Sequence, residues 1–185
     1  MSLFTGKGDG GTTKTFGCNQ RVSKSSAVAE ALGTLDEINS FLGICKEKSR
    51  ASFSVPPQDI PLHELLHQTQ GNLFIVQAEL AGADKKMSLD KVKETETIIN
   101  EIEKLMPPIT TFFISGGTEL AAHLDFARTL ARRAERRVVA VRDEGRQEIG
   151  DAMLAYLNRL SSLLYALARL TNHLSGITEE SPKYN

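Results

Sequence analysis

The sequence contains no tryptophan, and aromatic residues make up only 6% of its 185 residues. Hydrophobic residues still account for 41%, which is enough for a core and argues against general disorder. With so few aromatic rings, this core must consist mainly of leucine, isoleucine, alanine and valine. Such a composition suits helices packed on helices better than a β-sandwich. We therefore expect an all-α protein.

The sequence also has few cysteines, a small net charge and no long apolar run. Cys18 and Cys45 are far apart and lack the spacing of a metal site, so we expect ordinary thiols in a reducing compartment. A net charge of -1 provides no general attraction to nucleic acid or to an anionic membrane. No apolar run approaches the roughly 18 residues of a membrane span, and no signal-peptide core is present. These features predict a cytoplasmic protein that binds neither nucleic acid nor membrane.

Five segments carry apolar residues at steps of three and four, the period of one buried helical face. Helices are expected at 26–48, 62–83, 88–106, 118–142 and 148–174. Their connections are short and no convincing strand ladder lies between them. This pattern predicts an antiparallel five-helix bundle of the ferritin-like kind, in one domain covering residues 1–185.

The remaining segments divide the chain further. Residues 1–24 form a polar, glycine-rich loop, residues 25–175 the bundle and residues 176–185 a loose tail. Two adjacent prolines make 49–60 a loop, and 109–117 is predicted to be a short extended stretch that ends in two glycines. Ser88 is the expected N-cap of the third helix.

The N-terminal loop places four glycines among lysines and hydroxyls within residues 5–14. Glycine lets a backbone approach a ligand closely and turn its N–H groups inward, as phosphate-binding loops do. A dinucleotide-binding fold is excluded because no buried strand can precede Gly6, and a Walker A loop because no G-K-[ST] closes the segment. An anion site and a flexible terminus both remain open, and Lys14 and Lys24 favour the anion site.

The fourth expected helix is rich in arginine. Residues 128–146 hold seven arginines against three acidic residues. Arg128, Arg132 and Arg136 stand four residues apart and share one helical face, where like charges repel by about 0.2–0.5 kcal/mol per pair. Arginine also binds phosphate oxygens with two parallel hydrogen bonds. A solvated face remains open, but a polyanion such as a nucleoside triphosphate explains both this face and the glycine loop.

A zinc-protease pattern, H-E-x-x-H, occurs at His63 and His67. Its extended form fails, because Gln70 and Leu73 stand where a glycine and a third histidine belong. We interpret the two histidines as surface or packing residues and predict no protein-bound metal site.

Three blocks of the sequence resemble the trimeric helix-bundle ATP:cob(I)alamin adenosyltransferases. They are FTGKGDGGTTK with Arg21 and Lys24, ALGTLDEINS at 31–40, and the run from SGG at 115–117 through RRAERR at 132–137 to LNRLS at 157–161. Their order and spacing hold over nearly the whole chain. The resemblance implies a homotrimer that transfers the 5′-deoxyadenosyl group of ATP, with Mg²⁺, to the cobalt of reduced cob(I)alamin. It also implies a corrinoid reductase and a downstream adenosylcobalamin-dependent enzyme as partners.

The resemblance further implies an ATP site between neighbouring subunits. One subunit would wrap the triphosphate with Thr5, Gly6, Lys7, Gly8, Thr13, Lys14 and Lys24. The other would contact the nucleotide with Arg132, Arg133, Glu135, Arg136 and Asn158. Asp36 would pair with Arg128 across the interface, and Phe112 would lie against the corrinoid on the face where its lower ligand normally binds.

Two positions depart from the family pattern. The family's T-G-D-K-G reads KGDGG from Lys7, and its L-S-D ends here in Ser162 instead of an acid. The second departure keeps a non-catalytic nucleotide-binding or corrinoid-carrying protein open as an alternative. A nucleic-acid binder that uses the arginine helix is disfavoured by the net charge and by the scarcity of aromatic rings.

Overall fold

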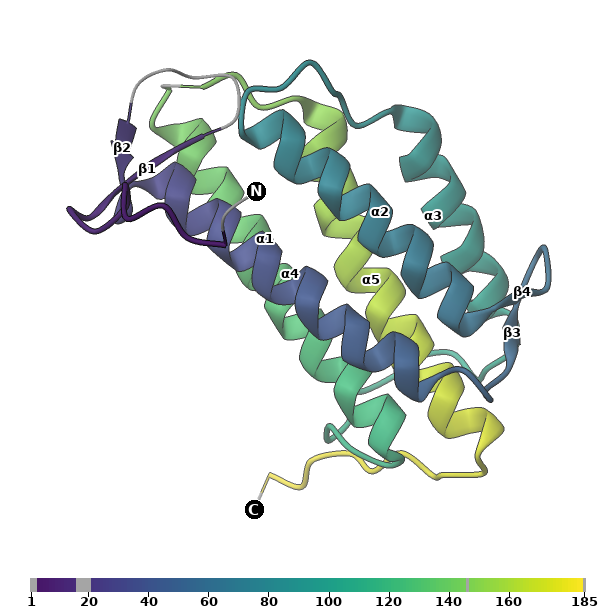
Figure 1. The fold of residues 1–185 in the computed structure, drawn as a ribbon. Coiled ribbons are helices and arrows are strands. Elements are labelled where there is room, and N and C mark those ends of the chain that lie inside the picture. The colour runs from purple at the N-terminus through teal and green to yellow at the C-terminus, as the bar shows by residue number, and fades with distance from the viewer. Residues whose placement is uncertain (1–2, 16–20, 146, 185) are drawn as a thin grey trace.

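The computed structural model describes residues 3–15, 21–145 and 147–184. Its helices are α1 (Ala27–Lys48), α2 (Leu62–Leu80), α3 (Leu89–Glu103), α4 (Glu119–Asp143) and α5 (Asp151–Leu174) (Figure 1). The predicted five-helix bundle is confirmed. The helix bounds differ from the expected ones by at most three residues. The largest differences are the end of α2, at 80 where 83 was expected, the end of α3, at 103 where 106 was expected, and the start of α5, at 151 where 148 was expected.

Within the described residues, two short strand pairs accompany the helices, so the expectation of no strand ladder was wrong at these two places. The antiparallel pairs are β1 (Thr12–Lys14) with β2 (Arg21–Ser23), and β3 (Ser54–Val55) with β4 (Ile60–Pro61). Each strand has at most three residues, too few for a period-two pattern to become visible. The stretch 109–117 is neither helix nor strand.

Hydroxyl side chains begin three of the helices. In each case the cap oxygen accepts a hydrogen bond from the backbone N–H three residues later, which satisfies a donor that has no partner within the helix. The pairs of cap and donor are Ser26 with Ala29, Ser88 with Lys91, and Thr118 with Ala121. The predicted cap at Ser88 is therefore confirmed.

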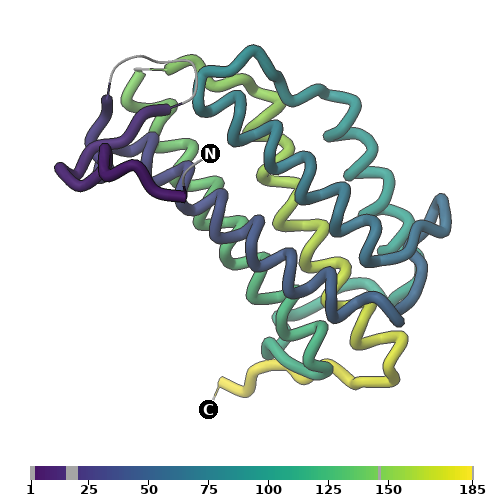
Figure 2. Tube along the Cα trace, viewed as in Figure 1, coloured from purple at the N-terminus to yellow at the C-terminus, as the bar shows by residue number. Residues whose placement is uncertain are grey.

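α4 packs between α1 and α5, α2 packs on α1, and α3 packs on α5; in the view of Figure 1, α2 lies between α1 and α3. α1 and α4 run antiparallel, with ion pairs from Lys48 to Glu119 at one end and from Arg137 to Glu30 toward the other. The N-terminal loop consequently lies at the end of the bundle where α4 ends. The segment 109–118 lies at the opposite end, beside the C-terminal tail (Figure 2).

The core between these helices is mostly aliphatic, as the composition predicts. Leu35, Leu66, Leu73 and Leu157 are fully buried, and each contributes about 1.5–3 kcal/mol relative to an exposed position. The fully buried Tyr156 is hydrogen-bonded to Asn72.

The thiol of Cys45 also lies within this core. Burial raises its pKa to about 11, with a smaller opposing contribution from a backbone hydrogen bond. At neutral pH it is therefore a protonated, weakly polar side chain that packs like a small hydrophobic residue. Cys18 lies outside the described residues. None of the described helices is both long and apolar enough to span a bilayer.

The first part of the C-terminal tail is held against the bundle at Glu179 and Glu180, where the expectation was a loose segment over 176–185. Glu179 accepts a hydrogen bond of 2.9 Å from Arg169 of α5, a side chain that is itself buried. The backbone oxygen of Glu180 accepts a 2.8 Å bond from the N–H of Ile114. These contacts depend on the fold, so a polar and glycine-containing tail sequence does not reveal them.

We predict that Glu79→Ala lowers the free energy of unfolding by about 1–3 kcal/mol, because it leaves a buried N–H group without its acceptor. The Glu79 side chain is 2% exposed, and it accepts a 2.7 Å bond from the N–H of Met87 in the connection between α2 and α3. Denaturant unfolding measures the change. Glu94→Ala, on the exposed surface of α3, is the control; equal stability of the two variants would contradict the prediction.

Candidate functional site

A pocket of about 550 Å³ lies at the end of the bundle where α4 begins. Its walls are formed by the segment 109–116, the first half of α4, the second half of α5 and Glu179 of the tail. Its polar and aromatic lining includes Phe112, Asp125, Arg128, Arg132, Ser161, Ser162, Tyr165, Arg169 and Asn172. The pocket therefore brings together three residues predicted from the sequence, namely Phe112, Arg128 and Arg132.

Phe112 stands on the outer wall of this pocket and is 80% exposed. The next residues of the wall are held from behind. The guanidinium of Arg169 lies 5.0 Å from the centre of the Phe113 ring, and Ile114 is bonded to the tail. The wall thus presents one large apolar ring to solvent on a supported backbone.

Arg128 is positioned by groups of its own subunit. Its Nε donates a 2.6 Å hydrogen bond to Asp125, and its guanidinium lies 5.8 Å from the centre of the Tyr165 ring. Burial raises the pKa of Asp125, but hydrogen bonds from Arg128 and Ser115 outweigh it, so that the pKa lies below its ordinary value. Asp125 therefore remains a carboxylate beside the arginine. The expected partner, Asp36, is exposed on α1.

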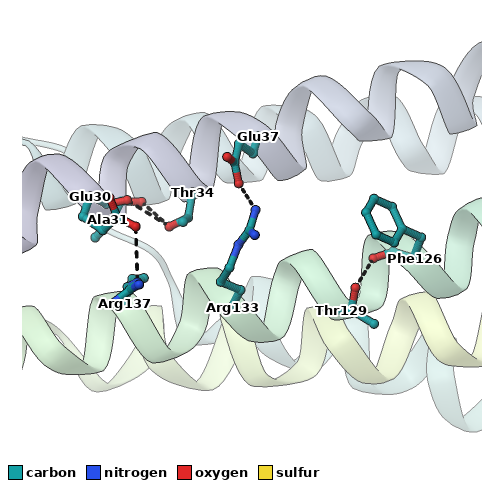
Figure 3. A network of polar contacts seen from close by, with 8 residues as sticks. All are labelled: Glu30, Ala31, Thr34, Glu37, Phe126, Thr129, Arg133 and Arg137. Atoms are coloured by element: carbon teal, nitrogen blue, oxygen red, sulfur yellow. Dashed lines mark hydrogen bonds and ion pairs between the residues drawn. The ribbon is translucent and has the colours of Figure 1, made fainter.

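The arginines of α4 fall into two groups. Arg133 and Arg137 point across to α1, where they form ion pairs with Glu37 and Glu30 (Figure 3). Arg132 and Arg136 are exposed, and within the described parts of the chain no ion pair forms with either. The first group joins two helices, whereas the second leaves donors open to an anion. Arg133, predicted to contact a nucleotide, is engaged with α1 in the single chain.

Two other predicted residues, Glu135 and Asn158, lie together between α4 and α5. The Asn158 amide donates a 2.9 Å hydrogen bond to Glu135 and accepts one of 2.8 Å from Arg159. Arg159 also donates to Glu96 of α3. The Glu135 carboxylate, close in sequence to the exposed arginines, is thereby linked to α5 through Asn158.

The N-terminal loop is folded back on itself by Arg21, a role that the sequence analysis missed. The Arg21 side chain donates to the carbonyl of Lys7 at 2.5 Å, and to the carbonyl and hydroxyl of Thr12 at 2.7 Å each. Gly6 and Gly11 have φ values of 66° and 75°, where side chains are disfavoured. In the sequence, only the position of Arg21 in the N-terminal motif pointed to a role for it. Its acceptors are mainly backbone oxygens, which no sequence pattern identifies.

Lys24 lies against the same loop. A Cβ atom added at Gly8 would come within 3.2 Å of the Lys24 ammonium, so glycine leaves room for this lysine. The predicted loop residues Thr5, Gly6, Lys7, Gly8, Thr13 and Lys14 lie with it on the turn and the β1–β2 ribbon. The structure thus brings the cationic and hydroxyl groups of the loop into one region.

The loop and the Phe112 end of the pocket lie toward opposite ends of the bundle in a single chain. Glu30 and Lys48 mark the two ends of the α1–α4 pairing, and they are about 27 Å apart along the α1 axis at 1.5 Å per residue. The loop precedes the first of these positions, whereas the segment 109–118, which contains Phe112, precedes the start of α4 beside the second (Figure 2).

The H-E-x-x-H pair has no third ligand in the described part of the chain. His63 is half-buried and His67 is exposed. Across residues 3–15, 21–145 and 147–184, no group of three or more His, Cys, Asp or Glu side chains is arranged to hold a metal ion.

Comparison with known proteins points to one family. A family model described as cobalamin adenosyltransferase matches residues 3–171. Corrinoid adenosyltransferase PduO of Citrobacter freundii is 39% identical over 94% of this chain and 50% of that protein. Its counterpart from Salmonella typhimurium is 37% identical over 99% and 54%. The corrinoid adenosyltransferase of Bacillus subtilis is 39% identical over 96% of this chain and 90% of its own length. The chain spans about half the length of the two PduO relatives.

Solved structures resemble the whole chain. A variant of the PduO-type ATP:corrinoid adenosyltransferase from Lactobacillus reuteri, complexed with cobalamin and ATP, matches with a TM-score of 0.83 and 29% identity over 99% of this chain and 100% of that one. Another variant of the same enzyme, complexed with ATP, matches with a TM-score of 0.83 and 28% identity over 98% and 100%.

We predict that Asp125→Asn makes stability less sensitive to acid. A carboxylate whose folded-state pKa is depressed stabilises the protein above its unfolded-state pKa of about 3.9, and this contribution is lost as the pH falls through the lower folded-state value. The variant lacks this contribution, so its free energy of unfolding should fall less than that of the wild type as the pH drops below about 4. Denaturant unfolding at a series of pH values provides the measurement. Asp84→Asn, at an exposed position after α2, is the control; parallel curves for Asp125→Asn and the wild type would refute the prediction.

Proposed function

Because this chain belongs to the cobalamin adenosyltransferase family, we propose that it transfers the 5′-deoxyadenosyl group of ATP to the cobalt of reduced cob(I)alamin. The products are adenosylcobalamin and triphosphate. The observation that carries the proposal is the pocket that combines the exposed ring of Phe112 with Arg128 and Arg132. An apolar ring suits a corrinoid, and neighbouring guanidinium groups suit a polyphosphate.

The reaction requires little covalent chemistry from the protein. Cobalt(I) attacks the ribose C5′, a Co–C bond forms, the C5′–O bond breaks, and triphosphate leaves with the bonding electron pair. The protein holds both substrates in line and stabilises the charge that develops on the leaving oxygen. Arg132 and Arg136, exposed on one face of α4, are suited to that second task, together with the Mg²⁺ that accompanies ATP.

The ATP site is shared between neighbouring subunits of a homotrimer in this proposal. One subunit contributes the glycine loop, through Thr5, Gly6, Lys7, Gly8, Thr13, Lys14 and Lys24. The other contributes Arg132, Arg133, Glu135, Arg136 and Asn158. The separation of the loop from the Phe112 end of the pocket within one chain supports this arrangement, because a second copy is the simplest source of the missing half.

The same interface is proposed to join Asp36 to Arg128. Asp36 is exposed on α1 and therefore accessible to a second subunit. Arg128 already has Asp125 as a partner within its chain, but a guanidinium has five N–H donors and can bind a second carboxylate. This geometry supports a shared ion pair at the subunit boundary.

Phe112 is proposed to exclude water and the lower corrinoid ligand from one face of the cobalt. Loss of that ligand leaves four-coordinate cobalt, which is easier to reduce. The exposed position of the ring, with Ile109 and Ile114 in the same wall, supports this role. A corrinoid reductase would supply the electron in the cytoplasm, and an adenosylcobalamin-dependent enzyme would receive the product.

A non-catalytic corrinoid or nucleotide carrier is the second candidate. Ser162, which stands where the family pattern has an acid, lines the pocket. Asp125 provides a carboxylate in the same pocket, and this favours the catalytic candidate.

The first experiment is to mix the protein with MgATP and chemically reduced cob(I)alamin and to follow the light-sensitive alkylated product by its absorption. Conversion with many turnovers supports the enzyme. ATP binding without conversion supports the carrier, and Ser162→Asp then becomes the first change to make.

We predict that Arg132→Ala lowers kcat about 100-fold or more, the usual effect of removing a preorganised group that stabilises developing charge. Steady-state rates with cob(I)alamin measure the loss, and circular dichroism should show unchanged helix content. Arg142→Ala is the matched control, because Arg142 is exposed near the end of the same helix. Rates near those of the wild type for Arg132→Ala would remove this residue from the site.

Mixing variants tests whether the site is shared. Arg132→Ala and Lys14→Ala subunits are unfolded together and refolded at equal ratio. Random trimers then contain about one quarter of interfaces with an intact arginine helix and an intact loop. Partial recovery of activity supports sharing between subunits, whereas activity no higher than that of the separate variants contradicts it.

We predict that Phe112→Ala reduces the rate more when the assay starts from cob(II)alamin and a reductant than when it starts from prereduced cob(I)alamin. The reason is that the ring acts on the reduction step. The same enzyme samples are compared in the two assays. Phe74→Ala, an exposed phenylalanine on α2, is the control. Equal losses in both assays would refute the role of the ring.

A further inference from the structure

One side chain of α5 connects the pocket wall to the start of α4. The Nδ2 group of Asn172 donates a 3.0 Å hydrogen bond to the carbonyl of Gly116, and its Oδ1 accepts a 3.0 Å bond from the N–H of Thr118. Asn172 is only 5% exposed although it lines the pocket. Its amide therefore bridges two residues of the backbone turn between the Phe112 wall and α4.

Gly117 lies within this bridge and fits it closely. Its φ of 94° is in the region that favours glycine. A Cβ atom added there would lie 2.2 Å from the Asn172 Oδ1, far inside normal contact. The side chain thus packs directly on the backbone of the turn, and both partners are matched in shape.

The residues of the wall next to Phe112 are also held in place by contacts with the tail and α5. Ile114 donates its N–H to the carbonyl of Glu180 at 2.8 Å, and Phe113 packs under Arg169, which is paired with Glu179. Phe112 is the next residue and is 80% exposed. Its ring therefore projects from a backbone whose place is set by α5 and the tail.

We propose that Asn172 is a positioning residue for Phe112, acting through the turn at Gly116 and Thr118. This inference rests on the proposed function, because it assigns Asn172 a role in orienting the ring against the corrinoid. The amide uses one of its two N–H donors and its carbonyl oxygen to bind the backbone of the turn, so Asn172 acts on Phe112 through the wall. A misplacement of about 1 Å at a reacting centre can lower the rate about 100-fold, which makes the rigidity of this wall relevant to turnover.

The test uses Asn172→Asp in the full-length protein. The variant keeps the size of the side chain and the acceptor for the Thr118 N–H, but it replaces the donor with an oxygen that faces the Gly116 carbonyl. Asn100→Asp makes the same chemical change on the exposed surface of α3 and is the control.

The expected result is a selective loss. The rate from cob(II)alamin falls about tenfold or more and the KM for the corrinoid rises, as for a ring that is displaced, while the KM for MgATP stays within about twofold. Hydrogen exchange measured by mass spectrometry becomes faster in peptides covering 109–118 and stays unchanged in those covering the β3–β4 hairpin. Asn100→Asp should behave like the wild type in every assay.

Two results overturn the proposal. One is unchanged exchange at 109–118. The other is a uniform loss in both cobalt assays and both KM values that follows a fall in melting temperature, since this indicates general destabilisation. If the wild-type protein converts no cob(I)alamin, the proposed function fails, and the exchange measurement still decides whether Asn172 holds the wall. If Asn172→Asp does not fold, Gly117→Ala displaces the amide from the other side and should give the same selective pattern.

Discussion

The burial of one face of α4 between α1 and α5 is the constraint on which the rest of the structure depends. Small residues line this face, including Ala127, Ala131, Ala134 and Val138, all of them fully buried. Because they are small, α4 can approach both neighbours closely, and its rotation about its own axis is decided by this contact. Every other side chain of α4 must then point toward one neighbour or into solvent.

The rotation of α4 about its own axis determines which of its arginines contact α1 and which face the pocket or solvent. Arg133 and Arg137 meet glutamates of α1, and they help to set the register of the two antiparallel helices (Figure 3). Arg128 and Arg132 line the pocket instead, and Arg136 is exposed. A single arginine-rich helix can thus contribute both to assembly of the bundle and to binding of an anion, because positions one residue apart project about 100° apart around the axis.

The antiparallel register also distributes the functional segments between the two ends of the bundle. The glycine loop precedes α1 and the Phe112 wall precedes α4, so opposite helix directions put them at opposite ends (Figure 2). Each segment is stabilised by one polar side chain, which lies within the N-terminal segment itself in the first case and on α5 in the second. Arg21 binds the carbonyl groups of the loop, and Asn172 binds the turn behind the wall.

The sequence by itself determined the five helices, the Ser88 cap and the common face of Arg128, Arg132 and Arg136, because these depend on residues within a few turns of one helix. Tertiary structure decided the contacts between distant segments. Arg133 and Glu37 are 96 residues apart, and their meeting requires the packed register of two helices. The attachment of the tail, the turn held by Asn172 and the folding back of the loop by Arg21 depend largely on backbone acceptors or donors. Backbone groups are nearly the same at every residue, so the pattern of side chains in the sequence does not predict which backbone groups will form these hydrogen bonds.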